Sequence, residues 1–431
     1  MNSNLRVLVI AQYFSPDMGG GSTRASNVVK GLLSKGCDVT VIAAFPHYPY
    51  GKVPKTYKSK AIVPERFGNA KVYRVWIPAL AHSSSMKRIF LHLCFIFSSL
   101  FALPFVDKVD VVWGANPNLF SFLPSFVYGT AKRVPIVRNV DDLWPEVFYE
   151  LGYVKSKFAK KVLDSLAWAS YTIPAAITPI SEGYKRSIVA KYGVSPERVH
   201  VVEVGVDDVK PLSVGKNLKG QFTIMYSGVL GLGYDFDVVL EAARFLSKND
   251  DVVLVIRGVG ELAPRLRKAI SEFGLRNVIL DTRFLPKDKL VALLGSADVF
   301  VLPMAGMHFV DLGLPTKVFE YQAYGKPIIC ISGGEAAKYV ESTKSGLIVK
   351  HNDARGFAEA AIRLYNDREF STELGMNGRE YVLEHLTSQK IGERMYKVLA
   401  SCNLKKNAPR TKFHSAPLRF RKVSEYQNES F

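Results

Sequence analysis

The segment that decides the fold is residues 315–328, which read PTKVFEYQAYGKPI. This pattern predicts a helix that begins near Thr316, ends at Gly325 and leads into a buried strand from Ile328. Helices and short apolar strands alternate in the same way along most of the chain. Such alternation is typical of parallel sheets with helices on both faces, so we expect an α/β protein.

The length of the chain indicates two domains. Its 431 residues are too many for one ordinary hydrophobic core, and 48% apolar with 22% charged residues is typical of a globular protein. We expect a first domain over residues 1–210 and a second over residues 211–378, joined by the polar stretch 207–219. A C-terminal helix over residues 379–402 should pack back on the first domain, and the basic residues 403–431 should form a disordered tail.

The apolar runs predict the strands of both domains. The first domain should have strands at Leu5–Ala11, Val39–Ala43, Val72–Val75, Val109–Trp113, Pro135–Asn139, Ala176–Pro179 and His200–Val202. The second should have strands at Phe222–Ser227, Val252–Arg257, Val278–Leu280, Val299–Leu302, Ile328–Ile331 and Leu347–Val349. Helical patterns lie between them, so each domain should be doubly wound.

The net charge of +18 is unevenly distributed: +11 in residues 1–210, +2 in residues 211–402 and +5 in residues 403–431. Nucleic acids and anionic membrane surfaces are the usual partners of such charge. No zinc-finger, RRM or KH pattern is present, so we expect a membrane surface and no nucleic acid. The four cysteines are widely spaced and form no zinc pattern, which favours a reduced, cytosolic compartment.

A long loop is expected at residues 45–65, because this stretch is rich in Pro and Tyr. It carries four lysines that could dock on a membrane, namely Lys52, Lys55, Lys58 and Lys60.

Residues 89–106, IFLHLCFIFSSLFALPFV, contain no formal charge and could nearly span a bilayer. A span would place two strands of one sheet on opposite sides of the membrane, so we exclude it. Two interpretations remain. The segment is either a helix buried in the domain or a helix partly exposed to a membrane surface and anchored by Lys87 and Arg88.

Glycines follow the first predicted strand, at Gly19, Gly20 and Gly21. They open the next helix, whose N-terminal N–H groups could bind an anion, with Arg24 as an added cation. Arg24 could also help to dock the protein on a membrane surface. Further along, Asp141 and Asp142 follow the strand that ends near Asn139. Two carboxylates at the carboxyl end of a strand indicate a ligand site, and helix capping is the alternative.

The second half contains two more glycine-rich turns at strand ends. One holds Gly228, Gly231 and Gly233, and the other follows Arg257 with Gly258 and Gly260. Together they are candidate cradles for phosphate groups. Residues 315–328 add a helix N-terminus with Lys317, which could hold a diphosphate, and Glu320, which could accept hydrogen bonds from ribose hydroxyls. The alternative for this pair is an ordinary surface helix.

These segments together resemble the family 4 glycosyltransferases, retaining enzymes of the GT-B fold, from Leu5 to about Ala400. The segment DLWPE at residues 142–146 is similar to a motif of the subgroup that acts in cell-surface polysaccharide synthesis. GVD at 205–207 matches the end of the family's NGVD hinge, and GVGE at 258–261 matches its GxGxE turn. Glu320 with AYGKPI at 323–328 matches the end of the donor motif, whose final Glu contacts the donor ribose.

The chain departs from the family pattern at three positions. The donor motif normally has a second Glu eight positions earlier, where this chain has Leu312, and the neighbouring Asp311 is a candidate substitute. The usual GRLxxxKG loop places Arg and Lys on the diphosphate, where this chain has Val229 and Tyr234. The histidine that often precedes the first-domain aspartate is Asp141 here.

The resemblance implies two facing Rossmann-like domains with an active-site cleft between them. It implies transfer of a sugar from a UDP- or GDP-linked donor with retention of configuration, without a metal or other cofactor. Lys317 and the 228–233 loop would hold the diphosphate, Glu320 the ribose, and Asp141 or Asp142 the sugar or the acceptor. The acceptor is expected to be anionic or lipid-linked, and the protein to be cytoplasmic and peripheral on the inner face of the cell membrane.

Three alternatives remain open from the sequence. The chain could be an inactive nucleotide-sugar-binding partner of another transferase, which would explain Val229, Tyr234 and Leu312. It could be a nucleotide-sugar 2-epimerase of the same fold. It could also be a transferase that uses a small acceptor and has no membrane association.

Overall fold

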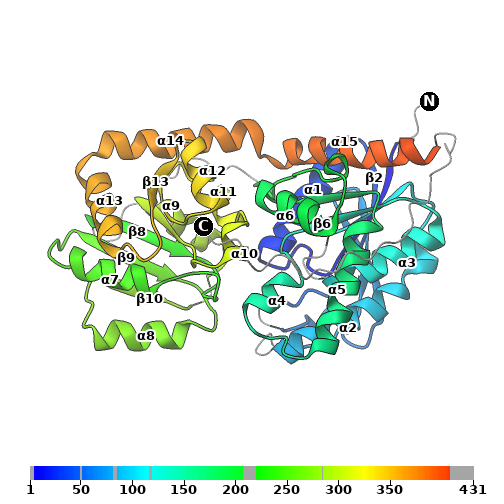
Figure 1. Cartoon of the computed structure of the whole chain (residues 1–431), viewed down its shortest axis with the longest axis horizontal. Coiled ribbons are helices and arrows are strands. Elements are labelled where there is room, and N and C mark those ends of the chain that lie inside the picture. Colours follow the sequence, from blue (N-terminus) through cyan, green and yellow to red (C-terminus); the bar gives the residue numbers. More distant parts are fainter. Residues whose placement is uncertain are drawn as a thin grey trace.

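The computed structural model describes residues 4–48, 51–80, 85–115, 119–206, 220–283 and 285–407, and it contains two α/β domains (Figure 1). Each domain is built on one twisted sheet with helices on both faces. The strand order is β3-β4-β2-β1-β5-β6-β7 in the first domain and β10-β9-β8-β11-β12-β13 in the second. The expected join at residues 207–219 lies outside the described residues.

In the first domain the strands are β1 Arg6–Ala11, β2 Asp38–Ala44, β3 Ile62–Phe67, β4 Ala70–Val75, β5 Val111–Gly114, β6 Ile136–Val140 and β7 Ala176–Pro179. All pairs are parallel except the β3–β4 hairpin at the sheet edge. The expected strand at His200–Val202 is absent, since only a bridge from Val199 to Ile177 forms there. The central strands are buried on both faces, which explains their unbroken apolar runs.

The expected long loop at 45–65 is partly wrong. Residues 62–67 form β3, which pairs with β4 in antiparallel register from Ile62 opposite Val75 to Phe67 opposite Ala70. The preceding residues contain a short 3₁₀ helix, Lys55–Tyr57. Its Tyr57 ring packs on Phe45, which ties this segment to the core.

The helices of the first domain are α1 Gly20–Ser34, α2 Ser85–Leu100, α3 Phe122–Lys132, α4 Glu146–Glu150, α5 Lys157–Thr172 and α6 Glu182–Tyr192. The apolar segment predicted as one helix over 89–106 is α2 followed by a 3₁₀ turn, Leu103–Phe105. Within the described ranges, every helix is too short or too polar to cross a membrane.

The second domain has six parallel strands: β8 Phe222–Ser227, β9 Val252–Arg257, β10 Val278–Asp281, β11 Val299–Pro303, β12 Ile328–Ile331 and β13 Gly346–Val349. Its helices are α7 Asp237–Leu246, α8 Ala263–Glu272, α9 Lys287–Gly295, α10 His308–Asp311, α11 Thr316–Ala323, α12 Glu335–Ser342 and α13 Ala354–Asn366. The buried face of α7 packs on α13 around one core.

Two helices bridge the domains at the C-terminal end (Figure 1). The expected single helix over 379–402 is wrong: α14 is Arg368–His385 and packs on α11, whereas α15 is Ser388–Asn407 and packs on α1. The two helices α1 and α15 cross closely at Gly31 and Gly392. A Cβ atom on either glycine would collide with the backbone of the opposite helix, so the crossing requires glycine there. Residues 403–407, expected in the tail, continue α15, and residues 408–431 lie outside the described residues.

Candidate active site

Both sheets have the doubly wound strand order, with a reversal point next to their first central strand. That point lies between β1 and β5 in the first domain and between β8 and β11 in the second. In such sheets, ligands bind outside the carboxyl ends of the strands at the reversal point. The segments that leave these ends are therefore the first place to look for a site: α1 after β1, the 228–233 loop after β8, and α10 and α11 after β11.

The N-termini of α1 and α11 meet across the domain interface. A Cβ atom on Gly20 would lie 3.0 Å from Oγ1 of Thr316, so a larger residue at the start of α1 would press on the start of α11. Neither helix N-terminus receives a side-chain cap, so the first N–H groups of both helices are left without that partner. Two such helix ends favour an anion between them.

Lys317 extends from the first turn of α11 toward the loop that follows β8. Its Nζ lies 5.6 Å from the centroid of the Tyr226 ring and 5.2 Å from that of Tyr234. A Cβ atom on Gly228 would collide with the end of the Lys317 side chain. The glycine at this strand end is therefore needed to admit the lysine.

The charge of Lys317 is held in place by its neighbours. Burial lowers the pKa of its ammonium, but a hydrogen bond with Tyr234 and the nearby Glu320 carboxylate more than offset this effect and raise it overall. Glu320 remains open to solvent on one side, while the surrounding protein removes part of its hydration and raises its pKa, an effect that Lys317 opposes. Lys317 is thus a cation at neutral pH, beside a hydrogen-bonding carboxyl group.

The other glycines of the second domain fall into two groups. Gly258 and Gly260 are required by packing, because Cβ atoms there would collide with the backbone of Gly228 and Leu230. Gly231 and Gly233 have no neighbour closer than 3.6 Å to a Cβ atom, so packing alone does not require glycine at either.

Arg257, predicted to contact the donor, is occupied elsewhere. Its guanidinium donates to the Arg283 carbonyl oxygen (3.0 Å) and lies 3.8 Å from a carboxylate oxygen of Asp281. Asp311, considered as a substitute for the missing Glu, accepts from the Ser332 hydroxyl and lies 3.3 Å from Nε2 of His351.

The prediction that Arg24 helps to dock the protein is wrong. Its side chain is 0% exposed, and Nε donates to Oδ1 of Asn139 (2.6 Å) and lies 3.1 Å from Oδ1 of Asp141. Arg24 also donates to the Val202 carbonyl oxygen (2.6 Å). A cation with these partners ties α1 to the ends of β6 and β7 and cannot reach a surface.

Asp141 and Asp142 have different environments. Asp141 is paired with Arg24, and it also accepts from Nδ2 of Asn139 (2.7 Å). Asp142 is exposed on one side, yet desolvation and the adjacent Asp141 raise its pKa to about 7. Neither aspartate caps the following helix α4, whose start has no side-chain cap. Asp142 is the carboxyl group left available to a ligand.

Tyr184 connects this pair of aspartates to the second domain. Both aspartates raise the pKa of its buried hydroxyl further, which places that hydroxyl near them. A Cβ atom on Gly313 would lie 2.8 Å from the Tyr184 hydroxyl oxygen. Asp142 therefore lies on the side of the first domain that faces the segment before α11.

The sequence patterns missed a second group of residues near α1. Oδ1 of Asp17 accepts from the backbone N–H groups of His47 (2.7 Å) and Tyr48 (2.8 Å), and burial raises the Asp17 pKa to about 6. The Tyr48 ring lies 3.1 Å from where a Cβ of Gly19 would be. Burial raises the pKa of the Tyr48 hydroxyl, an effect that the Lys317 cation opposes. The glycine triplet alone gave no sign of this contact.

Direct contacts hold the two domains together around the site. The Glu150 carboxylate accepts from the backbone N–H groups of His308 (2.7 Å) and Phe309 (3.2 Å). The Ser181 hydroxyl donates to the Leu312 carbonyl oxygen (2.6 Å), and Arg186 pairs with Glu335 (2.6 Å). The segment before α11 is thus fixed from both sides.

The residues predicted for docking lie on the surface of the first domain. Lys52, Lys55, Lys58, Lys60, Lys87 and Arg88 are exposed. The apolar segment was expected to be either a buried helix or a helix partly exposed to a membrane surface. The helix α2 is partly both, because it buries Leu91 and Phe95 in the core and exposes Phe90, Leu93 and Phe97. Among the residues that the structure describes, no group of His, Cys, Asp and Glu has the arrangement of a metal site.

Comparison with known proteins agrees with this architecture. The Glycosyltransferase Family 4 model matches residues 18–210, and the model described as glycosyl transferases group 1 matches residues 212–381. The chain belongs to the family 4 glycosyltransferases.

The relatives include three proteins with different coverage. WcaI of Escherichia coli K12, named as a colanic acid biosynthesis glycosyl transferase, is 28% identical over 74% of this chain and 82% of its own length. AmsK of Erwinia amylovora, an amylovoran biosynthesis glycosyltransferase, is 26% identical over 44% of this chain and 47% of its own. A GDP-mannose-dependent phosphatidylinositol monomannoside mannosyltransferase of Mycobacterium tuberculosis is 35% identical over 31% of this chain and 35% of its own.

Solved structures show the same fold. Sucrose-phosphate synthase from Thermosynechococcus elongatus superposes with a TM-score of 0.72 at 14% identity, covering 93% of this chain and 100% of its own. HepE of Anabaena, in complex with UDP and glucose, gives a TM-score of 0.65 at 13% identity, covering 92% and 100%. The protein therefore has the GT-B fold of two Rossmann-like domains.

Proposed function

We propose that this protein transfers a sugar from a UDP- or GDP-linked donor, with retention of configuration and without a metal, in the synthesis of a cell-surface polysaccharide. The observation that carries the proposal is the meeting of the α1 and α11 N-termini beside Lys317. The names of the relatives WcaI and AmsK support the polysaccharide.

The diphosphate of the donor would lie between the two helix N-termini. Lys317 would take the place of the Arg and Lys that the loop after β8 lacks, since it reaches that loop from α11. A cation and helix dipoles at the leaving group stabilise the negative charge that develops as the glycosidic bond breaks. Glu320 would accept hydrogen bonds from the ribose hydroxyls.

Asp142 would position the acceptor hydroxyl on the opposite side of the site. It is the aspartate without an ion-pair partner in the described structure, whereas Asp141 is held by Arg24. In front-face retention the leaving phosphate itself can accept the proton of the acceptor. The role of the protein is then orientation, which can supply a large part of the rate.

A turnover assay tests the proposal and separates it from an inactive partner protein, the alternative that Val229 and Tyr234 favour. The wild-type protein, supplied with nucleotide sugars and membrane extract, should release nucleoside diphosphate, and the NMR coupling constant of the product should show the anomeric configuration of the donor. Glu320→Gln should cut turnover strongly and keep the wild-type melting temperature. Donor binding without turnover would support the inactive partner, and an inverted product would refute retention.

We further propose an anionic or lipid-linked acceptor and peripheral attachment to an anionic membrane. A group of exposed apolar side chains lies on three helices that meet around the 3₁₀ turn Leu119–Ser121: α2 and α3, which pack together, and α5. They are Phe90, Leu93, Phe97, Leu123, Phe126, Val127, Phe158, Val162 and Trp168. Basic residues lie in or next to α2 and α5, namely Lys87, Arg88, Lys155, Lys157, Lys160 and Lys161. Apolar side chains interleaved with lysines are typical of interfacial helices.

Vesicle sedimentation tests this attachment. Changing Lys52, Lys55, Lys58 and Lys60 to Ser should release the protein from anionic vesicles at low salt, because each basic residue contributes about 1 kcal/mol near such a surface. The same four-fold change at lysines of the second domain, Lys248, Lys268, Lys289 and Lys338, is the matched control. Equal binding by both variants would place the docking face elsewhere, and a wild-type protein that does not sediment with the vesicles would favour a small acceptor.

A further inference from the structure

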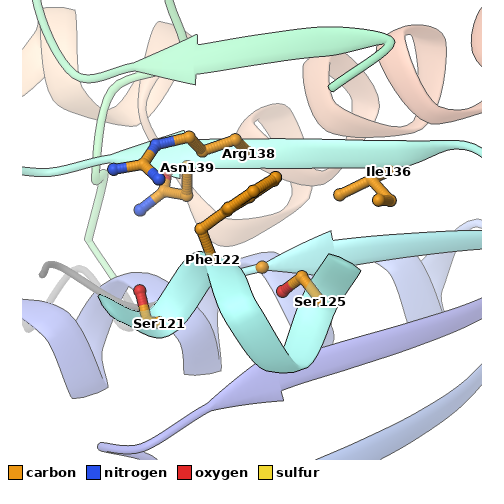
Figure 2. A pocket seen from close by; sticks show the side chains of 7 residues that line it. Ser121, Phe122, Ser125, Ile136, Arg138 and Asn139 are labelled. Atoms are coloured by element: carbon orange, nitrogen blue, oxygen red, sulfur yellow. The ribbon is translucent and has the colours of Figure 1, made fainter. Parts of the chain in front are cut away.

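A small cavity lies inside the first domain between β5, β6 and α3 (Figure 2). Its volume is about 10 Å³, close to the space that one water-sized atom needs. It is lined by Gly114, Ser121, Phe122, Ser125, Ile136, Arg138 and Asn139. The cavity can therefore receive one atom of a ligand group rather than a whole molecule.

Arg138 brings a buried positive charge to this cavity. Its side chain is 4% exposed, and within the described structure its Nε and Nη1 atoms have no hydrogen-bond partner. Its guanidinium carbon lies 4.8 Å from the centroid of the Tyr171 ring. The side chains of Arg138 and Tyr171 also share a hydrogen bond. The Glu146 carboxylate attracts this charge, but it also forms an ion pair with Lys191 (2.6 Å), so Arg138 shares its counter-ion with another cation.

A buried cation that shares its counter-ion and leaves two N–H groups without a hydrogen bond in the described structure is an expensive arrangement. Burial lowers the pKa of the Arg138 guanidinium, but arginine stays protonated in proteins. Two unused N–H donors of this cation in a polar cavity are therefore suited to an anion.

The opposite wall of the cavity also suits an anion. Figure 2 shows Arg138 from β6 on one side, with Ser121 and Ser125 from the start of α3 on the other. The hydroxyl of Ser125 is buried and has no hydrogen-bond partner in the described structure. The N-terminus of α3, which runs for 11 residues, has no side-chain cap, so its partial positive charge adds to that of Arg138.

Gly114 keeps this space open. It ends β5, and a Cβ atom on it would collide with Oγ of Ser125. An alanine at this position would fill the cavity without removing the charge of Arg138.

We propose that the cavity is an anion subsite in which Arg138, Ser125 and the N-terminus of α3 bind one oxygen of a phosphate group. The phosphate could be free in solution or part of a lipid-linked acceptor. Only the second source rests on the proposed function, in which the first domain holds an anionic acceptor. Phosphate binding itself does not depend on sugar transfer.

Inorganic phosphate is the first probe, used against chloride at equal ionic strength with the full chain. Phosphate at tenfold excess over its dissociation constant should raise the melting temperature by about 2–5 °C, because a ligand that binds only the folded state stabilises it. This increase should persist in Lys317→Met, which removes the donor-site cation, and vanish in Arg138→Met. A full increase in Arg138→Met, or its loss in Lys317→Met, would overturn the proposal.

One further variant and a second ligand keep the test decisive. If Arg138→Met does not fold, Gly114→Ala should abolish the phosphate effect while Arg138 stays in place, and an unchanged effect would overturn the proposal. Dihexanoyl phosphatidic acid serves as the lipid phosphate. A larger increase with it than with phosphate, again lost in Arg138→Met, identifies a lipid-linked source, whereas an equal increase identifies free phosphate. An affinity for UDP or GDP that stays at the wild-type value in Arg138→Met and Gly114→Ala separates this subsite from the donor site.

Discussion

Replacing Lys317 by methionine should weaken the binding of nucleoside diphosphates and leave the fold intact. The Lys317 ammonium lies over the rings of Tyr226 and Tyr234, at 5.6 and 5.2 Å from their centroids. Methionine can keep most contacts of the lysine stem, since it is unbranched and adapts to its surroundings. The substitution therefore removes a charge and little else.

The size of the loss follows from the contact that the charge would make. A hydrogen bond to a charged group contributes about 1.5–3 kcal/mol, and about 1.4 kcal/mol corresponds to a tenfold change in the dissociation constant. The dissociation constant for UDP or GDP should therefore rise about 10- to 150-fold. The nucleoside without phosphates should bind both proteins equally, because it offers nothing to Lys317.

Calorimetric titration with the nucleoside, its monophosphate and its diphosphate measures this loss step by step. Lys289→Met, which changes an exposed lysine on α9 away from α11, is the matched control. The loss should be largest for the diphosphate and absent for the nucleoside. A variant that binds the diphosphate as the wild type does, or that loses nucleoside affinity equally, would refute the phosphate role of Lys317.

Three other substitutions test neighbouring parts of the site. Gly228→Ala should weaken diphosphate binding about as much as the loss of Lys317, because the new Cβ atom would displace the lysine. Calorimetric titration measures this loss, and a wild-type affinity for the diphosphate would show that the displacement does not matter. The acceptor kcat/KM should rise with pH through about 7 as Asp142 ionises, and Asp142→Asn should give a flat profile; an unchanged profile would exclude Asp142. Since the folded-state pKa of Asp142 is raised, its protonated form stabilises the protein, and this contribution is complete below the unfolded pKa near 3.8 and is lost as pH rises through about 7. Arg24→Met should lower the free energy of unfolding by about 3–5 kcal/mol, because Asp141 is left without its buried partner, and a denaturant titration showing less than about 1 kcal/mol would contradict that pairing.

The fold could be predicted from the sequence because parallel strands buried on both faces give unbroken apolar runs. The segment 315–328 gave α11 and β12 within a residue or two. The errors lie where contacts far apart in the sequence decide. The strand β3 is stabilised by its antiparallel pairing with β4, and α15 continues to Asn407 beyond the expected end at residue 402.

The site was predictable in part. Lys317, Glu320 and the glycine loop after β8 follow directly from their positions at strand ends, and the structure brings them together. The role of Arg24 could not be seen, because its buried partners Asn139 and Asp141 are more than a hundred residues away. Tyr48 is likewise brought to the site by the side chain of Asp17, a contact that no local pattern encodes.

The most direct test of a nucleotide-sugar donor site is the thermal stability of the purified protein with UDP, GDP, ADP, CMP and their common sugars. We predict that one class, uridine or guanosine, raises the melting temperature, and that its diphosphates do so more than its nucleoside. No increase with any of these ligands would contradict a donor site between the N-termini of α1 and α11.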